Sequence, residues 1–162
     1  MTASEPPASE SGALPEAGAM PAAFAAAWNA GDADALAALF EADAEFINVV
    51  GLWWHDRAAI RTAHAYGLEV IFPGSTLRVV RTRENVLSEA VVLVQALLSL
   101  TGQAAHGGTE AGDRRTVISF VMRRDADGWL CAAAHNTDVV PGAETFVRTE
   151  AGLRPADYRP KG

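Results

Sequence analysis

The sequence predicts an α+β fold in which helices cover one face of a curved antiparallel or mixed sheet. Apolar residues recur at spacings of three and four through much of residues 20–71, a period typical of amphipathic helices. From residue 75 onward they alternate or run continuously, which is typical of strands. Helices followed by several long strands favour an α+β layout. The chain has 162 residues, the length of one such domain.

Two short helices joined by a tight turn are expected first. Pro21 suits the first turn of a helix, and Phe24 and Trp28 lie four residues apart on one of its faces. Asp32 or Asp34 can cap the second helix, because a short side-chain oxygen accepts hydrogen bonds from the free N–H groups of a first turn. Both helices are therefore expected to turn an apolar face toward the sheet.

A short strand and a third helix follow. Residues 44–50 are rich in strand-forming residues, and Asp56 can cap the helix after them. On that helix Ile60, His64 and Leu68 share one stripe. His64 is therefore expected to point at the sheet rather than at water.

The remaining strands are expected at residues 75–82, 90–100, 115–124 and 129–139, with a hairpin turn between the last two. Residues 90–100 are β-branched or leucine at both parities, which predicts a strand covered on both faces. If the helices cover the concave face, the convex face needs another cover. We therefore predict a homodimer that forms through the sheet.

The two ends of the chain differ from the middle. Residues 1–19 hold three prolines, three glutamates and one large internal apolar side chain, so we expect this segment to be disordered. Residues 20–140 form the predicted domain. Residues 141–162 are expected to form an extended tail that packs on the domain, with Phe146, Leu153 and Tyr158 as possible anchors.

Composition excludes several classes of partner and cofactor. The net charge of −7 at pH 7 argues against binding to nucleic acid or to an anionic membrane. No apolar run approaches the roughly 20 residues that span a bilayer, and no secretory signal is recognisable, so we expect a cytoplasmic protein. The single cysteine, Cys131, and the spacing of the four histidines predict no metal site. Gly107 and Gly108 do not open a helix after a strand, so no nucleotide cofactor is expected.

Three stretches resemble a known superfamily. They are AFAAAWNAGDADALAALFEADAEFINVVGLWWHDRAAIRTAHAYGL at residues 23–68, IFPGSTL at residues 71–77 and AAAHNTDVVPGAET at residues 132–145. They are similar to the NTF2-like superfamily of cone-shaped α+β domains and, within it, to the SgcJ/EcaC group associated with enediyne antibiotic biosynthesis. The resemblance implies three helices on the concave face of the sheet and a deep pocket between them. Such pockets host isomerases, cyclases, dehydratases, binding proteins and dimerisation modules, so the fold alone does not fix the activity.

Candidate site residues are polar or aromatic side chains expected to turn toward that pocket. His64 and His135 are the acid–base candidates, because histidine titrates near neutrality. Aromatic and amide side chains suit a flat conjugated ligand with a few polar atoms. The ligand-binding candidates are Trp28, Asn48, Trp53, Trp54, Gln95, Ser119 and Asn136.

Each candidate also has a structural interpretation. Trp53 and Trp54 are adjacent, so at most one of them can face inward from an extended segment, and the pair can instead anchor a loop to the core. His135 and Asn136 alternate along a strand, so only one of them can line the pocket. Gln95 and Ser119 can face either the pocket or a dimer partner. No carboxylate falls clearly on an inward face, which argues against chemistry that depends on an inward aspartate.

The leading hypothesis is a pocket protein of secondary metabolism that binds a polyunsaturated, enediyne-type polyketide intermediate, with or without helping to process it. One alternative is a SnoaL-like isomerase or cyclase, or a detoxifying enzyme, that acts on a small hydrophobic compound by histidine acid–base chemistry without a cofactor. Another is a homodimerisation module with a vestigial pocket. An open cavity of several hundred cubic ångströms would favour a ligand role over the last.

Overall fold

The computed structural model describes residues 12–160. Its helical elements are η1 (Ala17–Ala19), α1 (Met20–Asn29), α2 (Ala33–Ala38), α3 (Arg57–Tyr66) and η2 (Gly67–Ile71), a π-helical turn that continues α3. The strands are β1 (Phe40–Ile47), β2 (Trp53–Trp54), β3 (Thr76–Ser88), β4 (Val91–Thr101), β5 (Arg114–Arg124), β6 (Trp129–Asp138), β7 (Thr145–Thr149) and β8 (Gly152–Ala156). None of the helices in the described residues combines the length and apolar character that crossing a membrane requires.

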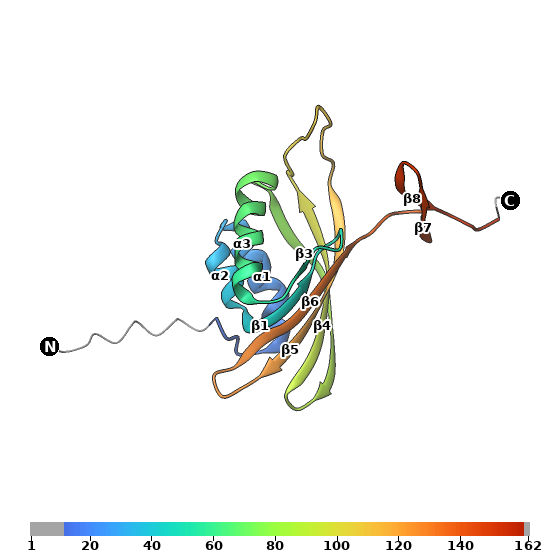
Figure 1. Cartoon of the computed structure of the whole chain (residues 1–162). Helices are drawn as coiled ribbons and strands as arrows, with labels where there is room; N and C mark the ends of the chain where they lie inside the picture. The colour runs from blue at the N-terminus through green and yellow to red at the C-terminus, as the bar shows by residue number, and fades with distance from the viewer. Residues whose placement is uncertain (1–11, 161–162) are drawn as a thin grey trace.

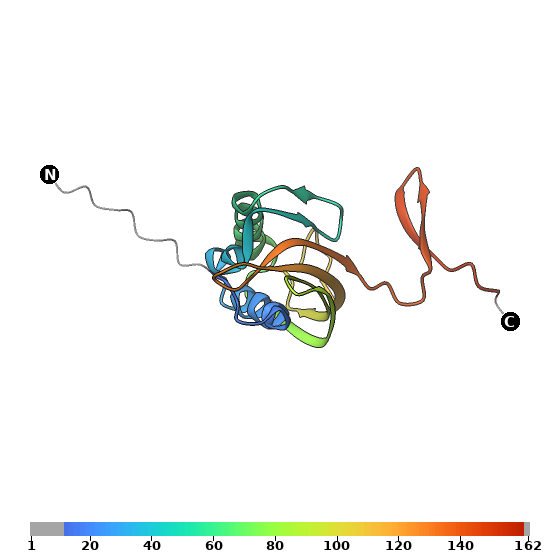
Figure 2. The ribbon, with the colours of Figure 1, turned by 90° about the horizontal axis from the view of Figure 1, so that it is seen from below.

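Strands β1 to β6 form one curved sheet in the order β2-β1-β6-β5-β4-β3, and α1, α2 and α3 lie on its concave side (Figures 1 and 2). The pairing of β1 with β6 is parallel and the others are antiparallel. The core between the layers includes Phe40, Phe46, Ile60 and Phe120, all nearly inaccessible to water. The mixed sheet with three helices on its concave face is the predicted fold class.

Local signals placed the helix starts correctly. Asp32 accepts a hydrogen bond from the backbone N–H of Ala35, and Asp56 accepts one from Ala59. Strand β1 differs from the expected residues 44–50, since it begins at Phe40 and ends at Ile47. Its early start follows from pairing with β6, a contact between distant parts of the chain that overrides local propensity.

The expectation of disorder through residue 19 is wrong for residues 12–19. Leu14 exchanges two backbone hydrogen bonds with Trp129, of 2.9 and 2.8 Å, and Ala17 is buried in the 3-10 turn that follows. Backbone pairing to a sheet needs no large side chains, so composition gave no sign of it. Residues 1–11 lie outside the described residues.

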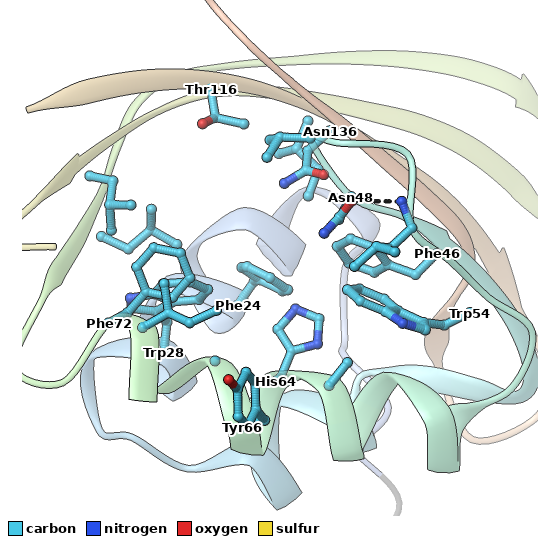
Figure 3. A pocket seen from close by; sticks show the side chains of 18 of the residues that line it. Phe24, Trp28, Phe46, Asn48, Trp54, His64, Tyr66, Phe72, Thr116 and Asn136 are labelled. Atoms are coloured by element: carbon cyan, nitrogen blue, oxygen red, sulfur yellow. Dashed lines mark hydrogen bonds between the residues drawn. The ribbon is translucent and has the colours of Figure 1, made fainter. Parts of the chain in front are cut away.

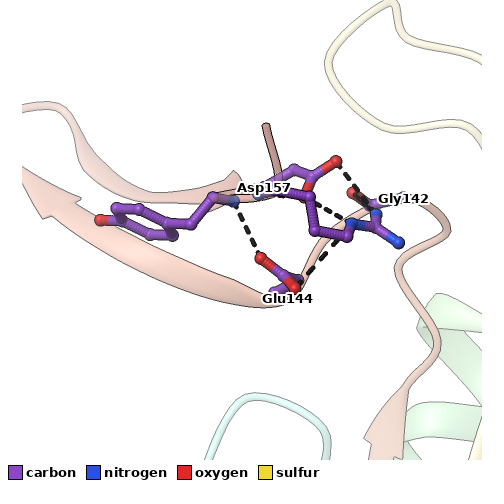
Figure 4. Close-up of polar contacts among 5 residues, drawn as sticks. Gly142, Glu144 and Asp157 are labelled. Carbon is purple, nitrogen blue, oxygen red and sulfur yellow. Dashed lines mark hydrogen bonds and ion pairs between the residues drawn. The ribbon is translucent and has the colours of Figure 1, made fainter. Parts of the chain in front are cut away.

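The expected packing of the tail on the domain is also wrong. Strands β7 and β8 form a separate hairpin that stands clear of the body on the side of the sheet away from the helices (Figures 1 and 2). Its base is held by Arg159, whose Nε lies 2.7 Å from Asp157 Oδ1 and 3.8 Å from Glu144 Oε1 (Figure 4). Phe146 and Leu153 are more than half exposed, so they do not anchor the tail.

Candidate functional site

A cavity of about 900 Å³ opens between α1, α3 and the concave face of the sheet. Its walls are mainly apolar and aromatic, because the inward faces of all three elements carry large apolar side chains. Figure 3 shows these side chains surrounding the open space. They include Phe24, Trp28, Phe46, Trp54, Phe72 and Ile118.

Two aromatic pairs stand at opposite sides of the cavity (Figure 3). Trp28 and Phe72 have ring centroids 5.0 Å apart, and those of Phe46 and Trp54 are 5.5 Å apart. The indole Nε1 of Trp28 donates to Ser75 Oγ at 3.0 Å, which fixes the orientation of that ring. The walls are therefore pre-formed surfaces suited to a flat or conjugated ligand.

His64 is buried on α3 and lines the cavity. Its Nδ1 lies 2.8 Å from the carbonyl oxygen of Ile60. Because that oxygen only accepts, Nδ1 carries the proton in the neutral ring and Nε2 is left with a free lone pair. Burial lowers the pKa of His64, since the charged ring would lose its hydration. The neutral ring is thus an acceptor, and a base, within an aromatic surround.

The sheet side of the cavity supplies the polar groups. Asn48 Oδ1 accepts from the backbone N–H groups of Val50 and Leu52 at 3.1 and 2.8 Å, so its Nδ2 amide faces the cavity (Figure 3). Asn136 extends into the cavity from β6 and Arg114 from β5. Asn136 Oδ1 and Arg114 Nε are buried and have no hydrogen-bond partner.

Sequence reasoning missed Arg114, Thr116 and Phe72 as lining residues. Arginine side chains are mostly exposed in folded proteins, so Arg114 was not among the expected lining residues. The alternation of Arg114, Thr116 and Ile118 along one strand face was the available signal. Phe72 follows the π-helical turn, for which the sequence carries no clear signal.

The other candidates, Trp53, Gln95, Ser119 and His135, do not line this cavity, so the alternative positions left open for them are the ones that the structure shows. Trp53 is 58% exposed and donates to Glu45 at the outer side of β1. Gln95 Nε2 donates to Ser119 Oγ on the convex face, and His135 pairs with Ser119 across β5 and β6 on that same face.

A β-bulge places Cys131 and His135 on opposite faces of β6. Cys131 and His135 are four residues apart, so simple alternation predicts one face for both. The register shifts between the Met122–Cys131 and Val121–Ala133 pairs, which inserts one residue into β6. Cys131 is therefore buried in the core while His135 is exposed.

This arrangement defines a class: a cone-shaped domain with a large apolar cavity, of the kind that binds small molecules between helices and sheet. A family model described as the SnoaL-like domain matches residues 19–137, and the chain belongs to this family. No curated protein sequence matches the chain significantly.

Solved structures agree on the fold. An uncharacterised cystatin-like protein from Caulobacter vibrioides is 24% identical over 76% of this chain and 87% of its own, with a TM-score of 0.70. An NTF2-like protein from Novosphingobium aromaticivorans is 19% identical over 76% and 80%, with a TM-score of 0.63. A ketosteroid isomerase-like protein from Erwinia carotovora is 14% identical over 76% and 93%, with a TM-score of 0.64. The NTF2-like fold expected from the resemblance is confirmed.

Proposed function

We propose that this protein binds a polyunsaturated, enediyne-type polyketide intermediate in its cavity, as a member of the SgcJ/EcaC group within the SnoaL-like family. The observation that carries the proposal is a cavity of about 900 Å³ with aromatic walls. Pockets for small ligands usually measure roughly 300–1,000 Å³, so this one has room for an extended or folded chain. A vestigial pocket would be expected to be filled by its own side chains.

Binding is tested with the methyl ester of trans-parinaric acid, a neutral, straight conjugated tetraene whose fluorescence rises in apolar surroundings. The matched variants are Trp54→Ala and Trp53→Ala, which remove the same side chain from adjacent residues. Trp54 lines the cavity and Trp53 does not. We expect Trp54→Ala to weaken binding roughly tenfold and Trp53→Ala to leave it unchanged. Equal effects, or no saturable binding to the wild type, would refute the proposal.

A catalytic version of the proposal rests on His64. Its Nε2 lone pair can take a proton from a carbon next to a carbonyl and return it further along the conjugated system, which moves a double bond. This step is balanced, since His64 takes one proton and returns one, which can exchange with solvent in between, and it needs no cofactor. The same chemistry would serve a detoxifying isomerase that acts on another hydrophobic compound.

The catalytic version is tested with a straight-chain β,γ-unsaturated ketone in D₂O, followed by NMR. Deuterium uptake and conversion to the conjugated ketone are expected with the wild type and not with His64→Asn. Binding of the parinaric acid methyl ester by the same variant shows that its cavity is intact. Binding without any turnover by the wild type would leave a binding protein and exclude the isomerase.

We also propose that a second copy of the chain covers the convex face of the sheet. Cross-strand pairs of leucine and valine form an apolar stripe there, on β4 and β5. The stripe lies between acidic residues on β1 and arginines on β3. A two-fold axis along the strands would set the arginine edge of one copy against the acidic edge of the other. The residues are Leu93, Leu97, Val117 and Val121 in the stripe, Asp43 and Glu45 on β1, and Arg78, Arg81 and Arg83 on β3.

The β7–β8 hairpin supports this arrangement, because it projects from the same side of the sheet with its apolar side chains exposed. Sedimentation equilibrium should give twice the chain mass of 17.0 kDa. Arg81→Glu should weaken the dimer, and adding Asp43→Arg should restore it. A monomeric wild type would refute the dimer.

A further inference from the structure

We infer that the cavity selects a ligand that carries a neutral carbonyl, bound by Arg114, and a hydroxyl, bound by Asn136, beside its apolar body. The inference rests on the proposed function and narrows its ligand class.

The first argument comes from two buried polar atoms. A buried donor or acceptor without a partner costs free energy, and the large majority of buried polar side-chain atoms in native proteins are paired. Within residues 12–160, the buried side-chain atoms without a partner are Arg114 Nε and Asn136 Oδ1. Both residues line the same cavity. Two unmet groups in one cavity indicate that a bound molecule, rather than the protein itself, completes them.

The second argument fixes what Arg114 can bind. Its Nε offers one N–H, so the ligand atom there must be an acceptor. Its Nη1 lies 3.6 Å from Asp138 Oδ2, and its guanidinium lies 5.6 Å from the ring centre of Phe72. The carboxylate already balances the positive charge, and its other oxygen accepts from Thr116 at 2.8 Å. A ligand carboxylate would be repelled by Asp138, whereas a neutral carbonyl would not.

The third argument concerns Asn136. It lies two residues before Asp138 on the same face of β6, and it pairs with Ile118 of the cavity wall. Its free Oδ1 is an acceptor, so the ligand group there must be a donor, and among neutral oxygen groups this is a hydroxyl. The cavity therefore combines aromatic walls for an unsaturated chain with a buried, unpaired donor on Arg114 and a buried, unpaired acceptor on Asn136, at separate positions. A chain built with both keto and hydroxyl groups has this chemistry.

The test uses four probes that share one straight conjugated tetraene and differ at the end: a hydroxy ketone, a ketone, a carboxylate and a methyl group. Affinities are measured by fluorescence titration for the wild type, Arg114→Lys and Asn136→Leu. Arg114→Lys keeps the charge beside Asp138 but removes the Nε donor. Asn136→Leu removes the acceptor and keeps the approximate volume. Circular dichroism and thermal unfolding check that each variant is folded.

The wild type should bind the hydroxy ketone tightest and the carboxylate weakest. Arg114→Lys should lower the affinity of both ketones roughly tenfold and leave the hydrocarbon unchanged. Asn136→Leu should remove the advantage of the hydroxy ketone over the ketone. If each variant weakens all four probes equally, or if the carboxylate binds as well as the ketone, the inference is wrong. If the hydrocarbon binds and the end groups make no difference, this inference fails while the proposed function stands. If no probe binds, both fail.

Discussion

Protonation of His64 should make the protein less stable at mildly acidic pH. Burial lowers the pKa of this ring in the folded state, while in the unfolded chain it titrates at its ordinary value of about 6.5. The unfolded chain therefore binds the proton more readily. The contribution of His64 to stability is fully present above the unfolded-state pKa of about 6.5 and is lost as the pH falls below it.

The size of the effect follows from linkage. A difference of one proton between the two states changes the free energy of unfolding by about 1.4 kcal/mol per pH unit. Between about pH 7.5 and about pH 5.5 the unfolded histidine passes from mostly neutral to mostly charged. If the buried ring stays neutral throughout, the free energy of unfolding falls by up to about 1.4 kcal/mol.

The assay is urea unfolding of the wild type and His64→Asn at both pH values, followed by tryptophan fluorescence. The other histidines in the described residues are exposed, and the carboxyls whose pKa is lowered, Asp34 and Asp157, titrate at more acidic pH. The substitution itself changes the absolute stability, so the quantity compared is the slope of the free energy of unfolding with pH. An unchanged slope in the variant, or a wild type that gains stability on acidification, would refute the reasoning.

Three further predictions concern stability and reactivity. Asp32→Ala should lower the free energy of unfolding by about 1 kcal/mol through loss of the α2 cap, and Asp32→Asn should not. Gly31→Ala should lower the free energy of unfolding by roughly 1–2 kcal/mol. The cause is backbone strain at its φ of +66° alone, since an added Cβ would meet no atom within 4 Å. Chemical denaturation measures the effects of the Asp32 and Gly31 substitutions. Burial raises the pKa of the Cys131 thiol, so it should react with Ellman's reagent only after unfolding; rapid labelling of the native protein would contradict this.

The sequence predicted correctly those parts of the fold that are determined by residues close together in the chain. The capping aspartates, the apolar stripe with His64 and the hairpin turn before β6 are fixed by neighbouring residues, and the structure contains them. For Trp54 and Asn136, the sequence limited the inward residue to one of two neighbours but could not say which one. Alternation along a strand gives two faces and does not identify the inner face. The bulge in β6 and the backbone pairing of Leu14 with Trp129 depend on distant strands. Those contacts leave no local pattern in the sequence.

The parallel pairing of β1 with β6 has a consequence for the order in which the protein assembles. Phe40 of β1 pairs with Cys131 of β6. Strand β1 therefore joins the sheet only after β6, about ninety residues later in the chain, has been synthesised. Contacts so far apart in the chain form slowly, because the intervening segment must first be ordered. Helices α1, α2 and α3 leave the ribosome together with β1, long before β6 is made. A chain that ends after β5 would therefore contain most of the residues that line the cavity but would not form the cavity.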